Sequence, residues 1–340
     1  MSDGSLLTDE RVEELLDGFS GVRLLVVGDA FLDEYLYGDA LRVSPEAPVP
    51  VVEVDEVWTV LGGAGNVVRN VVALGGGCEF VAAVGDDEAG DAVASRVADL
   101  GVDERGTVRV AGRPTSHKTR LVARRQQIVR FDRETRAPLL PLDAERVLER
   151  VQEAVPRVDG VVIEDYGKGL FSVEVGRAVM RAAAEAELAV NVDPKQSLEP
   201  FPGASLVKPN LAEAEALSGL AASESGIEAI GRRLQKLVGG ADVAITQGGG
   251  GITIFEGSQP GVYVPTVRQE VFDVQGAGDT IIAALSLARQ AGASFWEATV
   301  IANAAASVVV GKSGTATADR DEVRASLPAI RAAAREEELR

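Results

Sequence analysis

Short apolar runs alternate along this chain with longer segments of helical periodicity, and this alternation is the strongest constraint on its fold. The run VRLLVVG at 22–28 is continuous, rich in valine and leucine, and ends in glycine, which is typical of a buried strand. Similar runs recur at 80–85, 158–165, 188–193, 205–210 and 242–251, with Ala-, Glu- and Arg-rich segments between them. The pattern predicts an α/β fold with a mostly parallel sheet.

Two stretches depart from this alternation. Residues 35–60 and 107–133 contain strand-like pieces with no helical segment between them. They predict a small antiparallel β lid on the α/β body. Because the lid comes from two insertions, no single boundary divides the chain, and we expect one domain over residues 1–340.

The charge of the chain restricts its partners. A net charge of −18 at pH 7 argues against binding to a nucleic-acid backbone or to an anionic membrane. A small anionic substrate stays compatible, because it senses only the charges of its own site. No apolar run approaches the roughly 20 residues that span a bilayer, and the N-terminal segment lacks the basic and apolar regions of a signal peptide.

Cysteine and histidine each occur once, as Cys78 and His117. A single cysteine cannot form an intrachain disulfide, which fits a reducing compartment. The same count excludes a zinc site built from several cysteine or histidine ligands. We therefore expect a cytoplasmic protein in which Cys78 is a small core residue and His117 lies at the surface.

Polar residues follow several of the expected strands. They are Gly28-Asp29, Gly85-Asp86, Glu164-Asp165, Asp193-Pro194-Lys195 and Asn210. Ligands of open parallel sheets bind at the carboxyl ends of the strands. Each pair by itself is also typical of an ordinary turn, but together they predict a polar, ligand-binding rim.

The segment QGAGDT at 275–280 leads into an apolar helical stretch. If a helix begins near Gly278, the free N–H groups of its first turn form an anion hole, and Gly276 and Gly278 leave room for a phosphate. Asp279 would then lie beside that phosphate, where it could take a proton from an attacking hydroxyl. The alternative is that Asp279 caps the helix, and the loop alone does not decide between the two.

Two further segments suit a nucleotide and a sugar. In LGGAGN, the glycines Gly62 and Gly63 with Asn66 could hold sugar hydroxyls, although for this segment alone tight helix–sheet packing is the stronger interpretation. In KPNLAEAE, Asn210 and Glu213 lie three residues apart and share one helix face. Their oxygens suit Mg²⁺ held through water, and a helix capping box is the competing interpretation.

The common nucleotide-binding motifs are absent. Gly311-Lys312-Ser313 resembles the end of a P-loop, but the first glycine of that motif would fall at Ala306. The segment GAGNVV at 63–68 lacks the last glycine of the dinucleotide fingerprint. An NAD enzyme is therefore disfavoured.

Basic residues gather at 113–133 in an otherwise acidic chain. Alternate residues of a strand point to the same face, so without a bulge Lys118, Arg120 and Arg124 would share one face, together with Gln126 and Arg130. Arginine and lysine bind phosphates, so we favour a substrate phosphate here. A charged, solvated edge strand is the alternative. Lys168 and Lys195 are further phosphate-binding candidates.

The order of these motifs resembles the ribokinase-like, or PfkB, carbohydrate kinases over about residues 20 to 320. The motifs are GD-x-x-LD at 28–33, GGAGN at 62–66, DPK at 193–195, KPN-x-x-E at 208–213, and GAGDT at 276–280 followed by ANAAA at 302–306. The segments RVSPEAPVPVVEV at 42–54 and DYGKG at 165–169 resemble one branch more closely, the D-glycero-β-D-manno-heptose 7-phosphate kinases. The resemblance implies a three-layer α/β/α body with a β lid.

The resemblance also implies roles for matching residues. Asp279 matches the catalytic base, and Gly276, Ala277 and Gly278 match the anion hole. The other matches are sugar-binding Asp33, Gly62, Gly63 and Asn66, the Mg-ATP motif Asn210 and Glu213, the nucleotide-side loop glycines Gly248 and Gly251, and Asn303 near the adenine. Lys195 is assigned to the cofactor side. Gln275 stands where the family often has threonine, so a monovalent-cation site is left open.

The activity implied is ATP- and Mg²⁺-dependent phosphorylation of the anomeric hydroxyl of heptose 7-phosphate, giving the 1,7-bisphosphate on the way to ADP-heptose. Some members carry a second, nucleotidyltransferase domain, and we expect this chain to be the kinase part. The alternatives are a kinase for another sugar, such as fructose 6-phosphate or 2-keto-3-deoxygluconate, and a non-catalytic nucleotide or sugar sensor. Open lid edges with Val49, Val51 and Trp58 predict a homodimer through the lid.

Overall fold

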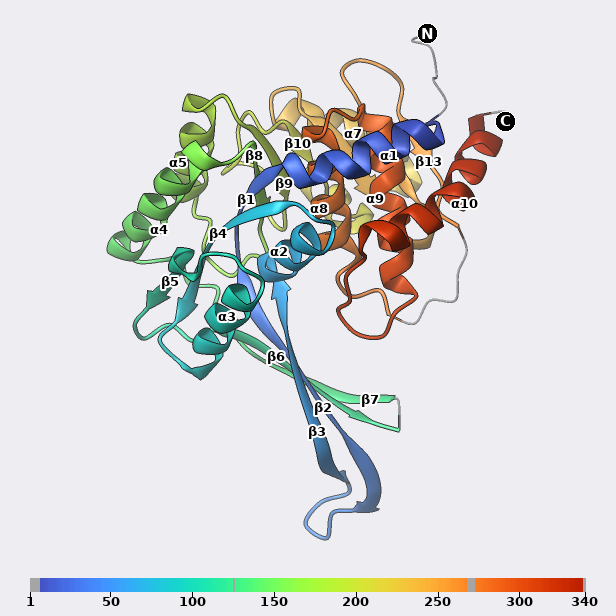
Figure 1. The fold of residues 1–340 in the computed structure, drawn as a ribbon. Helices are drawn as coiled ribbons and strands as arrows, with labels where there is room; N and C mark the ends of the chain where they lie inside the picture. Colours follow the sequence, from blue (N-terminus) through green and yellow to red (C-terminus); the bar gives the residue numbers. More distant parts are fainter. Residues whose placement is uncertain (1–6, 125, 268–272, 339–340) are drawn as a thin grey trace.

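The body of the molecule is built on one nine-stranded sheet. The computed structural model describes residues 7–124, 126–267 and 273–338. The strand order is β13-β12-β11-β10-β9-β8-β1-β4-β5, parallel from β11 to β5 and antiparallel at β12 and β13 (Figure 1). The strands are β1 (Arg23–Gly28), β4 (Gly77–Gly85), β5 (Thr107–Val110), β8 (Gly160–Glu164), β9 (Ala189–Asp193), β10 (Leu206–Val207), β11 (Asp242–Thr246), β12 (Ile252–Phe255) and β13 (Val262–Val264). The predicted α/β class is confirmed.

Helices cover both faces of this sheet, because successive side chains of its buried strands point to opposite faces. Leu24 and Val26 belong to one apolar core, and Leu25 and Val27 belong to the other. The first core packs under α1 (Asp9–Gly18), α2 (Ala64–Ala73), α3 (Glu88–Asp99), α8 (Ala277–Gln290), α9 (Phe295–Val310) and α10 (Arg320–Glu338). The second packs under α4 (Pro141–Ala154), α5 (Val173–Glu185), α6 (Leu211–Ser218) and α7 (Ala222–Leu237). The result is a three-layer α/β/α body.

A second sheet of four strands projects from the body as a long twisted ribbon (Figure 1). Its order is β3-β2-β6-β7, with β2 at Ala30–Val43, β3 at Pro50–Gly63, β6 at Ser116–Ala123 and β7 at Gln126–Arg133. We call these four strands the lid.

The lid differs from its prediction in two respects. The pair β2–β6 is parallel, so the sheet is mixed and not purely antiparallel. This follows from the chain path, because β2 and β6 both leave the body in the same direction. Residues 107–110 pair with β4 at the edge of the body sheet, so the second lid segment begins near Ser116.

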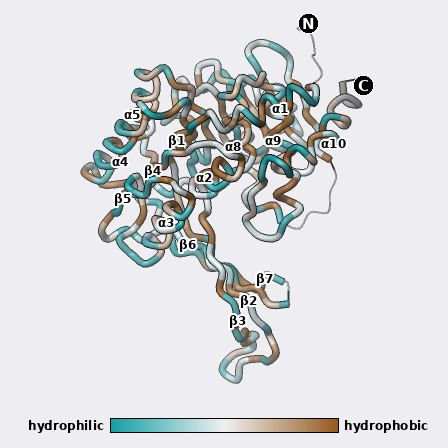
Figure 2. The backbone as a smooth tube through the Cα atoms, viewed as in Figure 1, coloured by the Kyte–Doolittle hydropathy of each residue, from teal (hydrophilic) through white to brown (hydrophobic). Residues whose placement is uncertain are grey.

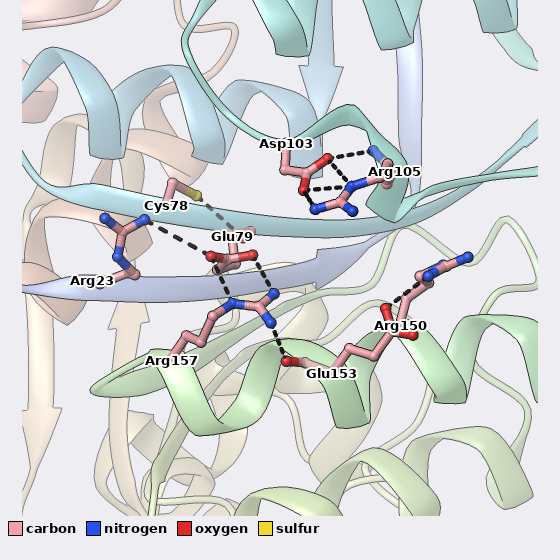
Figure 3. A network of polar contacts seen from close by, with 8 residues as sticks. All are labelled: Arg23, Cys78, Glu79, Asp103, Arg105, Arg150, Glu153 and Arg157. Carbon is pink, nitrogen blue, oxygen red and sulfur yellow. Dashed lines mark hydrogen bonds and ion pairs between the residues drawn. The ribbon is translucent and has the colours of Figure 1, made fainter.

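Charged side chains also gather at the amino ends of β1 and β4, the end of these strands away from the lid (Figure 3). Arg157 donates to both carboxylate oxygens of Glu79, at 3.3 and 2.9 Å, and Arg23 lies 3.9 Å from the same carboxylate. Cys78 is buried beside them, and burial raises the pKa of its thiol. The buried, protonated thiol fits a packing role, as expected from the sequence.

Within 7–124, 126–267 and 273–338, no helix combines the length and the apolar character that crossing a membrane requires.

Candidate active site

A cleft with a cavity volume of about 550 Å³ opens at the carboxyl ends of the parallel strands. Glu164, Asp193 and Thr246, from the ends of β8, β9 and β11, contribute to its lining. The first turn of α8, residues 276–279, lies on the same cleft. The polar rim predicted from the strand ends therefore surrounds a cavity that a ligand can enter.

Asp279 lies in the first turn of α8 and does not cap it. The N-cap is Gly276, whose φ of 78° is in the left-handed region that glycine adopts easily, and no side chain caps the helix. The Asp279 carboxylate instead accepts from Tyr166 Oη on Oδ1 at 2.8 Å and from Asn66 Nδ2 on Oδ2 at 2.7 Å. The capping alternative is excluded, and the backbone N–H groups of this first turn lie beside the carboxylate at the cleft.

Several charged groups surround Asp279, which is only 4% exposed. Burial raises the pKa of the Asp279 carboxyl above its ordinary value, while the hydrogen bonds from Asn66 and Tyr166 and the charge of Lys208 oppose the rise. A carboxylate with a raised pKa is a better proton acceptor than one in water. The environment therefore suits a general base.

Lys208 provides positive charge at the first turn of α8. Its ammonium forms a buried ion pair with Asp193 at 2.6 Å. A Cβ placed on Gly278 would lie 3.5 Å from Lys208 Nζ, so the ammonium faces the start of the helix. Helix amides and this ammonium together favour an anion such as a phosphoryl group.

Asp33 lies at the base of the lid and is buried against Arg120, with 2.5 Å between Arg120 Nη1 and Asp33 Oδ1. Gly62 allows this arrangement, because a Cβ there would lie 2.2 Å from the Phe31 ring and 2.4 Å from Asp33 Oδ2. Gly63 precedes α2 with a φ of 57°. These glycines let β3 pass close to Phe31 and Asp33.

Asn66 is fully buried, and both ends of its side-chain amide already have partners. Its side-chain amide donates to Asp279, and its Oδ1 accepts from Arg69 Nη1 at 2.9 Å. The structure therefore places Asn66 as a partner of the carboxylate. Direct contact with a sugar hydroxyl, which the sequence suggested, stays a prediction.

The register of the lid determines which basic residues face the body. Asp33 pairs with Lys118 across β2 and β6, Tyr35 pairs with Arg120, and Arg120 pairs with Arg130 across β6 and β7. Directly paired residues share one face of a sheet. The prediction that Lys118 and Arg120 share a face is confirmed, and Arg130 lies on that face farther out, half-exposed and 2.9 Å from Asp132.

Arg124 lies outside this group, contrary to the parity prediction. The register shifts between Leu121 and Val122, and β6 ends at Ala123. Arg124 follows in the hairpin turn with a φ of 49°, and its exposed side chain is 3.9 Å from Asp39. A bulge and a turn, neither visible in the residue spacing, remove it from the face that carries Lys118.

Lys118 lies over two aromatic rings at the base of the lid. Its ammonium is 3.6 Å from the centre of the Phe31 ring and 5.4 Å from that of Tyr166. Burial lowers the pKa of Lys118 and the charge of Lys168 acts in the same direction, while the charges of Asp33, Asp132 and Glu134 oppose the shift. Within the described part of the chain, Lys118 has no ion pair.

Asn210 and Glu213 line the other end of the cleft, and they form the capping box that was the competing interpretation. Asn210 Oδ1 accepts from Glu213 N at 2.9 Å, and Glu213 Oε2 accepts from Asn210 N at 3.0 Å. Lys195 Nζ lies 2.7 Å from Glu213 Oε1. Each of these oxygens keeps a second lone pair, so the capping box leaves them able to bind water.

Gly248, Gly251 and Asn303 also line this end of the cleft. Gly251 has a φ of 83°, and a Cβ there would lie 2.4 Å from the carbonyl oxygen of Val264, so only glycine fits. Asn303 is buried on α9 and donates to the carbonyl of Pro265 at 2.8 Å. Apolar Val267, Ala306 and Val310 complete a wall suited to a flat ring.

Sequence reasoning placed Asp193 on the polar rim without giving it a role, and it did not assign Tyr166 or Lys208 to the site, although all three line the cleft. Asp193 and Tyr166 stand at or just after the ends of β9 and β8, and Lys208 directly follows β10. Position at a strand end was therefore the signal that could have found them.

A family model for pfkB family carbohydrate kinases matches residues 23–322 of this chain. The chain belongs to the pfkB family of carbohydrate kinases. It is therefore a phosphotransferase that acts on a carbohydrate, and kinases of this family use ATP.

Two relatives of this pfkB kinase are bifunctional proteins HldE. The protein of Desulfatibacillum aliphaticivorans is 39% identical over 311 residues, which cover 91% of this chain and 64% of that protein. The protein of Paramagnetospirillum magneticum is 41% identical over 320 residues, which cover 94% of this chain and 65% of that protein. The chain thus spans just under two thirds of the length of these relatives.

Solved structures support the ribokinase-like fold of the kinase. Ribokinase from Arabidopsis thaliana, complexed with ribose and ATP, has a TM-score of 0.70 at 23% identity, covering 90% of this chain and 98% of that one. Phosphofructokinase-2 from Escherichia coli, in complex with potassium, has a TM-score of 0.75 at 21% identity, covering 91% of this chain and 99% of that one. The similarity covers about nine tenths of this chain in both comparisons.

Proposed function

We propose that this kinase transfers the γ-phosphoryl group of ATP to the anomeric hydroxyl of D-glycero-D-manno-heptose 7-phosphate, giving the 1,7-bisphosphate. The observation that carries a phosphorylated substrate is Lys118. Its ammonium lies on the body-facing side of the lid, near Lys168 and beside the ring of the tyrosine that contacts Asp279. A half-buried ammonium without an ion pair favours the binding of an anion. A substrate phosphate would provide that anion.

Asp279 would act as the general base. It would accept the proton of the anomeric hydroxyl while the oxygen attacks the γ-phosphorus in line with the departing ADP. Backbone N–H groups at Gly276, Gly278 and Asp279 would stabilise the charge on the transferred group, with Lys208 beside them, while the Ala277 N–H donates to the carbonyl of Val274 at 3.4 Å. The burial of Asp279 supports this role, because it keeps the carboxylate basic.

The residues at the nucleotide end of the cleft fit a magnesium ion bound through water. Within the described residues no cluster of three or more acidic, cysteine or histidine side chains could hold a metal directly. Asn210 and Glu213 have only the second lone pairs of their capping-box oxygens to offer, which suits contacts through water. Bound there, Mg²⁺ would neutralise the charge of the ATP phosphates. A monovalent cation remains an open proposal.

The choice of heptose 7-phosphate rests on two observations. The lid segment 42–54 and the DYGKG segment at 165–169 resemble the heptose kinase branch, and the relatives reported above are bifunctional proteins HldE. A kinase for fructose 6-phosphate or 2-keto-3-deoxygluconate is the second candidate. The use of ATP favours the cytoplasm as the compartment of the reaction.

The test is ADP release from Mg-ATP with a panel of sugars: heptose 7-phosphate, fructose 6-phosphate, fructose, ribose and 2-keto-3-deoxygluconate. Turnover on heptose 7-phosphate that greatly exceeds turnover on the others is the expected result. Turnover on another sugar would support the kinase activity and contradict heptose 7-phosphate as the substrate. ATP binding without turnover on any sugar would favour a sensor.

We also propose that two copies associate through the outer face of the lid. The row Val57, Leu36, Leu121 and Val129 crosses all four strands on the face opposite Asp33. Val57 and Val129 are 57% and 45% exposed, and Figure 2 shows hydrophobic stretches along the projecting strands. An exposed apolar row of this kind favours a second copy as its partner. Light scattering that shows only monomer would contradict this.

A further inference from the structure

The segment after β8, residues 165–170, is held in place by one buried carboxylate. Asp29 is 4% exposed and accepts backbone N–H groups from Tyr166 at 3.0 Å, Lys168 at 2.9 Å and Leu170 at 3.3 Å. The Asp29 N–H in turn donates to the carbonyl of Glu164 at 3.0 Å. Three amides on one carboxylate fix the path of the segment, so Tyr166 leaves a rigid backbone.

The side chain of Tyr166 is restrained at both ends. Its ring packs edge-on against Phe31, with 5.1 Å between centroids and an angle of 82°. Its hydroxyl donates to Asp279 Oδ1 at 2.8 Å. Burial of the hydroxyl, together with the negative charges of Asp279, Glu164 and Asp193, raises the pKa of Tyr166 well above its ordinary value. The phenol therefore stays protonated and remains a donor at every working pH.

Resting on the proposed role of Asp279, we propose that Tyr166 is a positioning residue that holds the catalytic carboxylate in place for proton transfer. Tyr166 holds Oδ1 and Asn66 holds Oδ2, so the carboxylate cannot rotate. A carboxylate has about four lone-pair sites, so an acceptor site is left for the hydroxyl of the sugar. The Tyr166 proton does not move in the reaction.

A hydrogen bond to the ionised form of an acid also keeps that form stable. Removing the Tyr166 hydroxyl should therefore raise the pKa of Asp279 further. The other polar groups that face Asp279 are Asn66 and Arg69 from α2, Asp33 from β2, Glu164 from β8, and Asp193 and Lys208 from the segments after β9 and β10. None of them is altered by this change, so a shift would report the one hydrogen bond.

The experiment is Tyr166→Phe, which keeps the ring against Phe31 and removes only the hydroxyl. With the best sugar of the panel, kcat should fall about ten-fold, while the KM for ATP stays the same. The acidic limb of the pH profile of kcat/KM should move upward by about one pH unit. The control is Tyr263→Phe, on β13 and 38% exposed, which should change neither.

Two results would overturn the inference. A higher KM for the sugar with unchanged kcat and an unmoved acidic limb would make Tyr166 a substrate contact. Wild-type kinetics in Tyr166→Phe would make its hydroxyl irrelevant to the reaction. Failure of the proposed base is a separate result, because it would appear as activity in Asp279→Asn.

Discussion

The body and the lid are built on different principles at the candidate site. The body lines the cleft with backbone amides at the start of α8, glycine turns at 248–251, and cations that already have partners, such as Lys208 on Asp193 and Lys195 on Glu213. Among the described residues, none of the lid strands lines the cleft; the lid adjoins it where the Lys118 ammonium lies 5.4 Å from the Tyr166 ring, and Lys118 has no ion pair there. The body thus holds groups for any phosphoryl transfer, whereas the lid holds the groups that can choose a sugar.

The buried ion pairs fit this division. Lys208–Asp193 and Arg120–Asp33 are both almost fully buried. Such pairs contribute little net stability, because desolvation of the two charges offsets their attraction. Their value lies in fixed orientation: one directs an ammonium at the start of α8, and the other fixes the base of the lid beside the cleft.

The largest loss of activity should come from a change in the part of the body that lines the cleft. Asp279→Asn keeps the shape and loses the proton acceptor, so kcat should fall by about 10³-fold for every sugar tested. Binding of ATP, measured by calorimetry, should change little. If the loss appeared with one sugar and not with another, phosphoryl transfer and sugar selection would not be divided between the body and the lid.

A smaller loss of activity should come from a change at the end of the cleft that is proposed for the nucleotide. Glu213→Gln can still accept the N–H of Asn210 but loses the charge next to Lys195. The KM for Mg-ATP should rise about ten-fold, since one charged contact is lost, and the KM for the sugar should not change. Glu215→Gln, on the same helix α6 but outside the cleft, is the matched control. An increase confined to the KM of the sugar would contradict the assignment.

The smallest effect concerns stability. Burial, followed by the charge of Asp29, raises the pKa of Asp165 to about 6. The folded protein then holds this proton more tightly than the unfolded chain, so stability is lost as the pH rises from about 4 through 6. Asp165→Asn should raise the free energy of unfolding by about 1–3 kcal/mol at pH 8 and by much less at pH 4. Urea unfolding at the two pH values measures this, and equal changes at both would contradict it.

Sequence reasoning succeeded where a feature depends on neighbouring residues. The glycines and Asp279 at the start of α8, and the pair Asn210 and Glu213, lie within one helical turn, so their spacing predicts their geometry. The shared face of Lys118 and Arg120 follows from strand alternation in the same way.

It failed where a feature depends on packing between distant segments. Tyr166 and Asp279 are 113 residues apart, and Asp29 meets Leu170 from 141 residues away. No local pattern encodes these contacts, because they depend on how β1, β8 and α8 assemble. Arg124 was misplaced because a bulge and a turn interrupt the alternation of β6.

The most direct test of the division between the body and the lid compares one sugar with and without its phosphate, in the wild type and in Lys118→Met. Arg42→Met, which removes an exposed cation from the same lid, is the control. The account predicts that Lys118→Met lowers the preference for the phosphorylated sugar, as a ratio of kcat/KM values, at least about ten-fold, with an unchanged KM for ATP. An unchanged ratio would contradict it and would place the recognition of the phosphate elsewhere.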